Sequence, residues 1–152
     1  MGKVIAAFAG TGKTHIGDKY ENAIDLDLGS FRWIYDGPES LPYEQRKAMR
    51  VFSQNPDWPQ NYIDAITESI DKFDLVLVSY TPEIAHLVSH NFIPGPNAWG
   101  ALEARYRARG NPERFVELFR NHFQVVITMS GIQIKDEEYL EDALKREGFL
   151  PT

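Results

Sequence analysis

The stretch Ala7-Phe8-Ala9-Gly10-Thr11-Gly12-Lys13-Thr14 follows the short apolar run Val4-Ile5-Ala6 and precedes a helix predicted from Lys13 to about Tyr20. A turn between a strand and a helix binds phosphate when it bends so tightly that successive backbone N–H groups point at the anion. Gly10 and Gly12 allow that bend because they lack a Cβ and tolerate a positive φ. We therefore expect Ala9, Gly10, Thr11, Gly12, Lys13 and Thr14 to form a phosphate-binding loop.

Two side chains of this stretch suit a nucleoside triphosphate with its metal ion. The Lys13 ammonium can reach the β- and γ-phosphate oxygens, and the Thr14 hydroxyl can enter the coordination shell of Mg²⁺. The expected cofactors are therefore ATP and Mg²⁺. The pattern G-x-x-x-x-G-K-[ST] has glycine at its first position, where this chain has the small residue Ala7.

Composition narrows the class of protein. The chain has 152 residues, a formal net charge of −6 and no cysteine. This length fits one domain, 1–152, and the lack of cysteine excludes disulfides and Cys-ligated zinc. The acidic charge without a long Lys/Arg run argues against stable nucleic-acid binding. The first residues run straight into a strand too short for a signal or membrane segment, so we expect a cytoplasmic protein that binds nucleotides, with no membrane partner. A homodimer is one oligomeric state left open.

A second strand is predicted over residues 23–28, where apolar residues alternate with Asp25 and Asp27. Alternation places both carboxylates on one side of the strand. Ligands of open α/β sheets collect at the carboxyl ends of the strands, so either carboxylate could face the phosphates and the metal ion. Asp27 is a candidate catalytic residue and, with Thr14, a candidate metal ligand, and Asp25 is the alternative that would help Thr14 through water. Asp25 is a candidate substrate-binding residue. The alternative is a solvated strand face with two ordinary acids.

Residues 29–62 form a long insertion that is rich in aromatic and basic side chains. Arg32 and Trp33 come first, and a helix predicted over 42–53 carries Arg46 and Arg50. Guanidinium groups suit phosphate oxygens and aromatic rings suit a nucleobase, so we interpret the insertion as the acceptor-binding segment. The alternative is that the aromatic residues form a satellite core and the arginines a solvated helix face.

The pattern of the remaining chain predicts further elements. A helix should begin with Asp57 as N-cap and bury Ile63, Ile66, Ile70 and Phe73. A buried strand should follow over 74–79 and present Ser79 as a wall of the substrate site. We expect a helix over 82–91, a loop over 93–100, a strand over 124–129, and a last helix over 136–147 that stops at Gly148.

Residues 98–121 form a lid-like segment with the densest positive charge. Arg105 and Arg109 lie four residues apart on one helix face, while Arg107 points elsewhere. Two arginines on one face are what charge stabilisation of a transferring phosphoryl group needs, so both are candidate catalytic residues. Alternatively, these arginines form surface ion pairs with Glu103, Glu113 and Glu117.

The order of these features resembles a group of small P-loop proteins of phages and bacteria that are described as nucleoside or nucleotide kinase-like. The resemblance is carried by the 7–14 stretch, by Asp25-Leu26-Asp27 with Phe31 behind it, and by Arg105-Tyr106-Arg107-Ala108-Arg109-Gly110-Asn111. It implies an α/β fold with three α/β/α layers, a parallel sheet and a helical lid. The chain departs from the pattern at Ala7, and at Ile93–Gly100, which looks too short and broken for the strand that such folds often place before the lid.

The leading hypothesis is transfer of the γ-phosphoryl group from ATP to a nucleoside monophosphate, with a deoxynucleotide as the expected acceptor. Arg32, Arg46 or Arg50 would bind the phosphate of a monophosphate, and Asp27 would act as base if the acceptor were a nucleoside. The alternative is a nucleotide-binding module with weak or no turnover that acts through a protein partner. It is motivated by Asp74, which precedes its strand instead of ending it. A kinase of polynucleotide ends is a third possibility, which the acidic charge disfavours.

Overall fold

The computed structural model describes residues 2–36, 40–49 and 52–152. Its helices and strands alternate along most of the chain, as the sequence predicts for an α/β fold. In chain order the elements are β1 (Lys3–Ala7), α1 (Lys13–Lys19), β2 (Ala23–Asp25), α2 (Leu28–Arg32), β3 (Trp33–Tyr35), α3 (Tyr43–Met49), β4 (Phe52–Gln54), α4 (Gln60–Ile70), β5 (Leu75–Val78), the 3₁₀ helix η1 (Pro82–Leu87), β6 (His90–Pro94), α5 (Trp99–Ala108), α6 (Glu113–Val126), β7 (Ile132–Ile134) and α7 (Leu140–Arg146).

Five strands form a parallel sheet in the order β2-β5-β1-β6-β7. The strand β1 lies at its centre, with β5 on one side and β6 on the other. Because all five strands run in the same direction, the loops that follow them emerge at one edge of the sheet. The chain turns from one half of the sheet to the other beside β1, and ligands of such sheets bind outside the carboxyl ends at that point.

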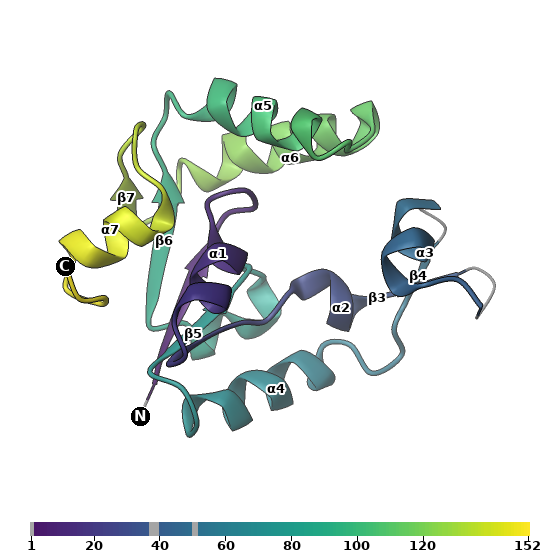
Figure 1. Ribbon diagram of the computed structural model, residues 1–152, viewed down its shortest axis with the longest axis horizontal. Helices are drawn as coiled ribbons and strands as arrows, with labels where there is room; N and C mark the ends of the chain where they lie inside the picture. Colours follow the sequence, from purple (N-terminus) through teal and green to yellow (C-terminus); the bar gives the residue numbers. More distant parts are fainter. Residues whose placement is uncertain (1, 37–39, 50–51) are drawn as a thin grey trace.

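Helices cover both faces of this sheet and give three layers (Figure 1). Alternate residues of β1 enter different cores, as the pleat of a strand requires. Ile5 and Ala7 pack in one core with residues of α1 and α7, and Val4 and Ala6 pack in the other with residues of α4. The predicted three-layer α/β/α fold with a parallel sheet is thus confirmed.

Two further units lie beside the sheet in Figure 1. The helices α5 and α6 run along each other above the loop that follows β1, and α3 with the antiparallel pair β3 and β4 projects to one side. The pair α5 and α6 has its own apolar cluster, built on Leu102, Tyr106, Val116 and Phe123. Among the described residues, no helix has the length and apolar character needed to cross a bilayer.

Elements with a clear apolar period lie where the sequence predicts them. The helix α1 runs from Lys13, β5 is buried along its whole length, and Ile66 of α4 is fully buried with Ile63, Ile70 and Phe73 packed around it. The final helix α7 is followed by Gly148 at a φ of 83°, as expected for a C-terminal stop.

The predicted strand over 124–129 is wrong, because α6 continues to Val126. The β-branched run has a high intrinsic strand preference, but packing decides the outcome. Phe123 is buried against α5, whereas Val125 is 63% exposed, which is a helical and not a strand-like pattern of burial. The last strand of the sheet is β7, in a segment for which we predicted no element.

The stretch before the lid also differs from expectation. The predicted helix over 82–91 is only the short η1, and β6 begins at His90. The segment expected to be a loop therefore starts with a buried sheet strand, and the strand that seemed missing from the pattern is present. Pro94 is the last residue of β6, so its missing N–H hardly disturbs the hydrogen bonds between the strands. The prediction was wrong because we interpreted this proline as a residue that prevents a strand.

Three boundaries differ as well. The helix predicted over 42–53 ends at Met49, because Phe52–Gln54 pairs with Trp33–Tyr35 as β4. The N-cap of α4 is Pro59 and not Asp57. The helix α7 begins at Leu140, and β2 stops at Asp25, short of the predicted end at residue 28.

Candidate functional site

The 7–14 loop joins β1 to α1 at the carboxyl edge of the sheet. Gly10 and Gly12 have φ angles of 81° and 110°, a left-handed region that favours glycine. Within the described part of the chain, the backbone N–H groups of Gly10, Gly12 and Lys13 donate to no protein acceptor. Successive unpaired N–H groups in a tight turn are the donors that an anion-binding nest requires.

The carbonyl groups of the same loop, in contrast, are held by other parts of the protein. The Tyr106 hydroxyl donates to Ala9 O at 2.6 Å, and Arg105 Nη1 donates to Gly10 O at 2.7 Å. The backbone N–H of Leu140 donates to the next carbonyl, that of Thr11, at 2.9 Å. Side chains of α5 and the first residue of α7 therefore fix three consecutive peptide groups.

The Lys13 side chain curls back over its own loop. Its Nζ donates to Ala7 O at 2.9 Å and to Phe8 O at 3.2 Å. Burial lowers the pKa of Lys13 to about 8, and Arg109 acts in the same direction, whereas Asp25 and Asp27 oppose the shift. The ammonium group thus lies at the loop in a desolvated position where a bound anion would restore its preference for the charged form.

Thr14 and Asp25 form the polar pair nearest to this loop, since Thr14 Oγ1 donates to Asp25 Oδ2 at 2.9 Å. Burial raises the pKa of Asp25, while the Thr14 hydrogen bond and Lys13 counteract it. The other oxygen, Asp25 Oδ1, is buried and has no partner among the described residues. A hydroxyl beside a carboxylate with a spare oxygen fits Mg²⁺, which takes one or two protein oxygens together with phosphate and water. Among the described residues no group of three or more His, Asp or Glu could hold a metal ion by itself.

Asp27 makes no hydrogen bond to Thr14, although its charge acts on both Lys13 and Asp25. The strand β2 ends at Asp25, so the alternation predicted from the sequence does not reach Asp27. Its side chain is 53% exposed, accepts from Ser30 Oγ at 3.1 Å, and lies 3.7 Å from Lys47 Nζ. The structure thus brings Asp25, and not Asp27, to Thr14. Lys47 is a candidate that our sequence analysis missed, because nothing local to α3 indicates which of its basic residues faces Asp27.

The insertion gathers aromatic rings around Arg32. Its guanidinium lies 4.9 Å from the Trp33 ring centroid and 5.4 Å from that of Trp58, and Trp33 in turn packs on Phe52. The Nε atoms of Arg32 and Arg46 are buried and have no partner among the described residues. Arg50 lies outside the described residues. The insertion therefore offers π-faces and guanidinium groups together, as a nucleotide-binding segment requires.

Ser79 follows β5 at the same edge of the sheet. Its backbone N–H donates to the Tyr62 hydroxyl at 3.3 Å, and that hydroxyl donates to Leu26 O at 2.8 Å. The buried Tyr62 therefore ties the ends of β2 and β5 together. Because β5 lies between β1 and β2 in the sheet, Ser79 follows the strand between the one that leads into the 7–14 loop and the one that leads into the insertion.

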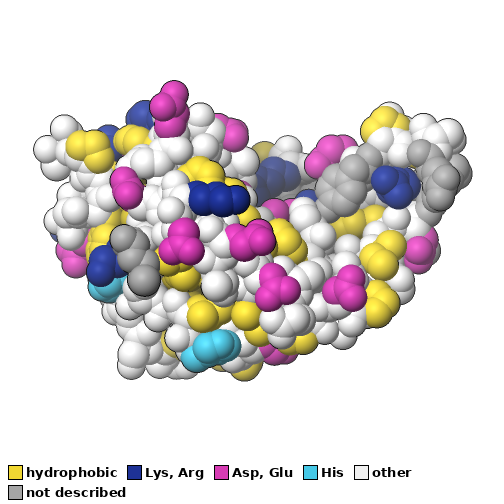
Figure 2. Space-filling view, turned by 90° about the horizontal axis from the view of Figure 1, so that it is seen from below, with side chains coloured by type: hydrophobic (Ala, Val, Ile, Leu, Met, Phe, Trp, Pro, Cys, Tyr) yellow, Lys and Arg dark blue, Asp and Glu magenta, His cyan; other side chains and the backbone are white. Residues whose placement is uncertain are grey.

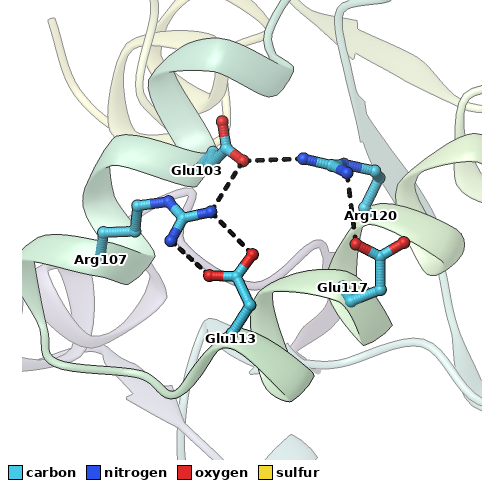
Figure 3. Close-up of polar contacts among 5 residues, drawn as sticks. All are labelled: Glu103, Arg107, Glu113, Glu117 and Arg120. Carbon is cyan, nitrogen blue, oxygen red and sulfur yellow. Dashed lines mark hydrogen bonds and ion pairs between the residues drawn. The ribbon is translucent and has the colours of Figure 1, made fainter.

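The three arginines of the lid-like segment have different environments. Arg107 pairs with Glu103 and Glu113, and Glu103 also pairs with Arg120, which contacts Glu117 (Figure 3). This network fastens α5 to α6, so the surface ion-pair interpretation holds for Arg107. Arg105 instead reaches the loop, where its Cζ also lies 4.1 Å from the Tyr139 ring centroid.

Arg109 follows α5 and is exposed. It makes no ion pair with any described residue, and its charge affects the pKa of Lys13. A small cavity beside the loop, lined by Thr11, Gly95, Arg105 and Asp136 among others, has room for about one water molecule. Arg105 therefore lines this cavity, whereas Arg109 is an exposed cation whose charge reaches Lys13.

The face of the molecule that is seen from below in Figure 2, on the side of α4, carries more Asp and Glu than Lys and Arg side chains and no continuous basic area. It is hollowed between the main body and the projecting α3 unit. The basic side chains named above are therefore local features of a chain with a net charge of −6. No protein-family model matches the sequence, and no curated protein matches it significantly.

Proposed function

We propose that the chain binds ATP through the 7–14 loop and transfers its terminal phosphoryl group to a nucleoside monophosphate, with a deoxynucleotide as the expected acceptor. The observation that carries this proposal is the loop itself. Its carbonyls at residues 9–11 are held by α5 and α7, its N–H groups at Gly10, Gly12 and Lys13 have no acceptor among the described residues, and Lys13 adds an ammonium group. Donors in this arrangement suit the oxygens of a polyphosphate.

Thr14 and Asp25 would hold Mg²⁺, directly or through water. The ion supplies charge neutralisation on the terminal phosphates when bound. Lys13 would leave its two carbonyl partners and bind phosphate oxygens, and Arg109 would approach the transferring group from α5. Such transfer depends on positioning and on neutralising charge, which these residues provide without a covalent intermediate.

In the reaction, an oxygen of the acceptor phosphate bonds to the γ-phosphorus while the bond to the β–γ bridging oxygen breaks, and ADP leaves. A phosphate monoester is largely ionised at neutral pH, because its second pKa is about 6, so this acceptor needs no general base. Asp27 is therefore not needed as a general base, which agrees with its contacts to Lys47 and Ser30. Arg32, Arg46 and Lys47 are cations of the insertion that would bind the acceptor, and the cytoplasm is where ATP and such acceptors meet.

A second candidate function is a nucleotide-binding module that works through a protein partner. It is favoured by the residues after β5, where Ser79, Tyr80 and Thr81 stand and no carboxylate follows the strand. Many P-loop NTPases place an aspartate on a second strand near the metal. In this chain Asp25 on β2 would have to serve that purpose.

A coupled assay for ADP release tests the proposal. We expect ATP-dependent transfer to at least one common nucleoside monophosphate when the deoxy and ribo forms are screened. The variant Lys13→Ala should lower kcat/KM by on the order of 10³-fold, because a charge that binds the transferring phosphates is lost. ATP binding without transfer to any nucleoside or monophosphate would favour the partner-dependent module, and absence of ATP binding would exclude both functions.

A further inference from the structure

The helix α5 holds two neighbouring peptide groups of the 7–14 loop through two neighbouring residues. Arg105 Nη1 donates to Gly10 O, and the Tyr106 hydroxyl donates to Ala9 O at 2.6 Å. A peptide group is planar and trans, so its carbonyl and its N–H point in opposite directions. Fixing Ala9 O therefore orients the N–H of Gly10 toward the other side of the loop, and fixing Gly10 O does the same for the N–H of Thr11.

Tyr106 fits this role better than a surface side chain would. It is fully buried, its ring packs 4.7 Å from that of Phe119, and burial raises its pKa, so the phenol stays protonated and can donate. A Cβ built on Gly10 would lie only 2.8 Å from Tyr106 Cε1. Ring and glycine are thus in direct contact, and the loop cannot shift toward α5.

The unit that carries Tyr106 is itself braced. The apolar cluster of Leu102, Tyr106, Val116 and Phe123 includes Phe8 and Ala9 of the loop as packed neighbours. On the outer side the ion pairs of Figure 3 connect α5 to α6. Side chains anchored in this way can hold a backbone in a fixed orientation.

We propose that Tyr106 is a positioning residue for phosphate binding, which pre-orients the N–H groups of the 7–14 loop by holding Ala9 O. This inference rests on the proposed binding of ATP at the same loop. In this proposal the pair α5 and α6 holds the loop in the ligand-free protein and also carries Arg109. Among the described residues the hydroxyl hydrogen-bonds to the loop carbonyl Ala9 O, so it acts through the backbone and not on the substrate.

The test is Tyr106→Phe, which keeps the buried ring and removes only the hydroxyl. Titration calorimetry with Mg²⁺ and a non-hydrolysable ATP analogue should show roughly fivefold weaker binding, the value expected for one lost hydrogen bond. Binding of inorganic pyrophosphate should weaken by a similar factor, because the substitution affects the backbone N–H groups that donate to phosphate oxygens. The heteronuclear ¹⁵N NOE of the Gly10 amide should fall in the free variant, because its peptide group is no longer held, and this measurement needs no ligand.

The control is Thr67→Val on α4. The Thr67 hydroxyl also donates to a backbone carbonyl, that of Ile63 at 2.8 Å, and Thr67 has no part in the proposed site. The control should bind the ATP analogue within twofold of the unmodified chain. If the unmodified chain binds the analogue and Tyr106→Phe binds it equally well, with an unchanged ¹⁵N NOE at Gly10, the inference is wrong while the proposed function stands. If the unmodified chain binds neither analogue nor pyrophosphate, the proposed function itself fails and this inference with it.

Discussion

At the scale of single residues, Lys13 shows how a binding site opposes stability. Its ammonium is desolvated at the loop, where its pKa falls to about 8 from the ordinary 10.5. The folded state therefore binds this proton less tightly than the unfolded state does. The resulting penalty is fully present below about pH 8 and is relieved as the pH rises from there toward 10.5.

The variant Lys13→Met tests this sign. It keeps an unbranched side chain, removes the charge, and should raise the free energy of unfolding at pH 7 by on the order of 1–2 kcal/mol, since its two carbonyl hydrogen bonds offset part of the gain. Urea unfolding of both chains at pH 7 and pH 10 measures the effect. The difference between them should shrink at the higher pH, and a variant that is less stable at pH 7 would contradict the assigned pKa shift.

Residues of the loop could be predicted from the sequence because their spacing reflects local backbone chemistry. Gly10 and Gly12 do adopt positive φ angles, as their place in the pattern requires. Helical spacing separated Arg107 from Arg105 and Arg109, but it could not show that Arg105 donates to Gly10 O, because spacing gives the face of a side chain and not its partner. No sequence pattern indicated Tyr106, since its proposed role depends on a contact with Ala9, 97 residues away in sequence.

At the scale of elements, a helix or strand was predicted correctly where the apolar pattern of the sequence and the packing in the structure favour the same element. The helix α4 and the strand β5 were predicted because their apolar periods are clear. The run 124–129 was assigned to the wrong element because its β-branched residues favour a strand, while burial of Phe123 against α5 favours a helix. The strand β6 was hidden by the proline and glycine at its end.

The predicted end of β2, at residue 28, was wrong, and this boundary affects the assignment of the metal ligands. A longer strand would have put Asp25 and Asp27 on one side, but the strand stops and only Asp25 reaches Thr14. We predict that Asp25→Asn raises the Mg²⁺ concentration needed for half-maximal nucleotide binding by about tenfold, the usual loss for a group that supports a metal.

Asp27→Asn serves as the comparison for that variant. It should leave the Mg²⁺ requirement unchanged, because Asp27 lies beside Lys47 and Ser30 and not at Thr14. Both variants are compared by titrating Mg²⁺ against a fluorescent ADP analogue. A larger change in Asp27→Asn than in Asp25→Asn would reverse the assignment of the metal ligands.

At the scale of the whole molecule, the sheet order brings the site together. The 7–14 loop follows the central strand β1, Asp25 is the last residue of β2, and Ser79 follows β5 at the same edge of the sheet. The pair α5 and α6 braces the loop from one direction, and the projecting α3 unit lies away from it to the side (Figure 1). The parallel sheet and the layers were predictable from alternating elements, but the contact of α5 with the loop was not.

The central claim is that the N–H groups of the 7–14 loop bind phosphate. Titration of ¹⁵N-labelled protein with Mg²⁺ and ADP, followed by NMR, tests it at the atoms concerned. The account predicts saturable shifts in the amide resonances of residues 10–14, absent or much weaker in Lys13→Met. Saturable binding that leaves these five resonances unmoved, or no binding at all, would contradict it.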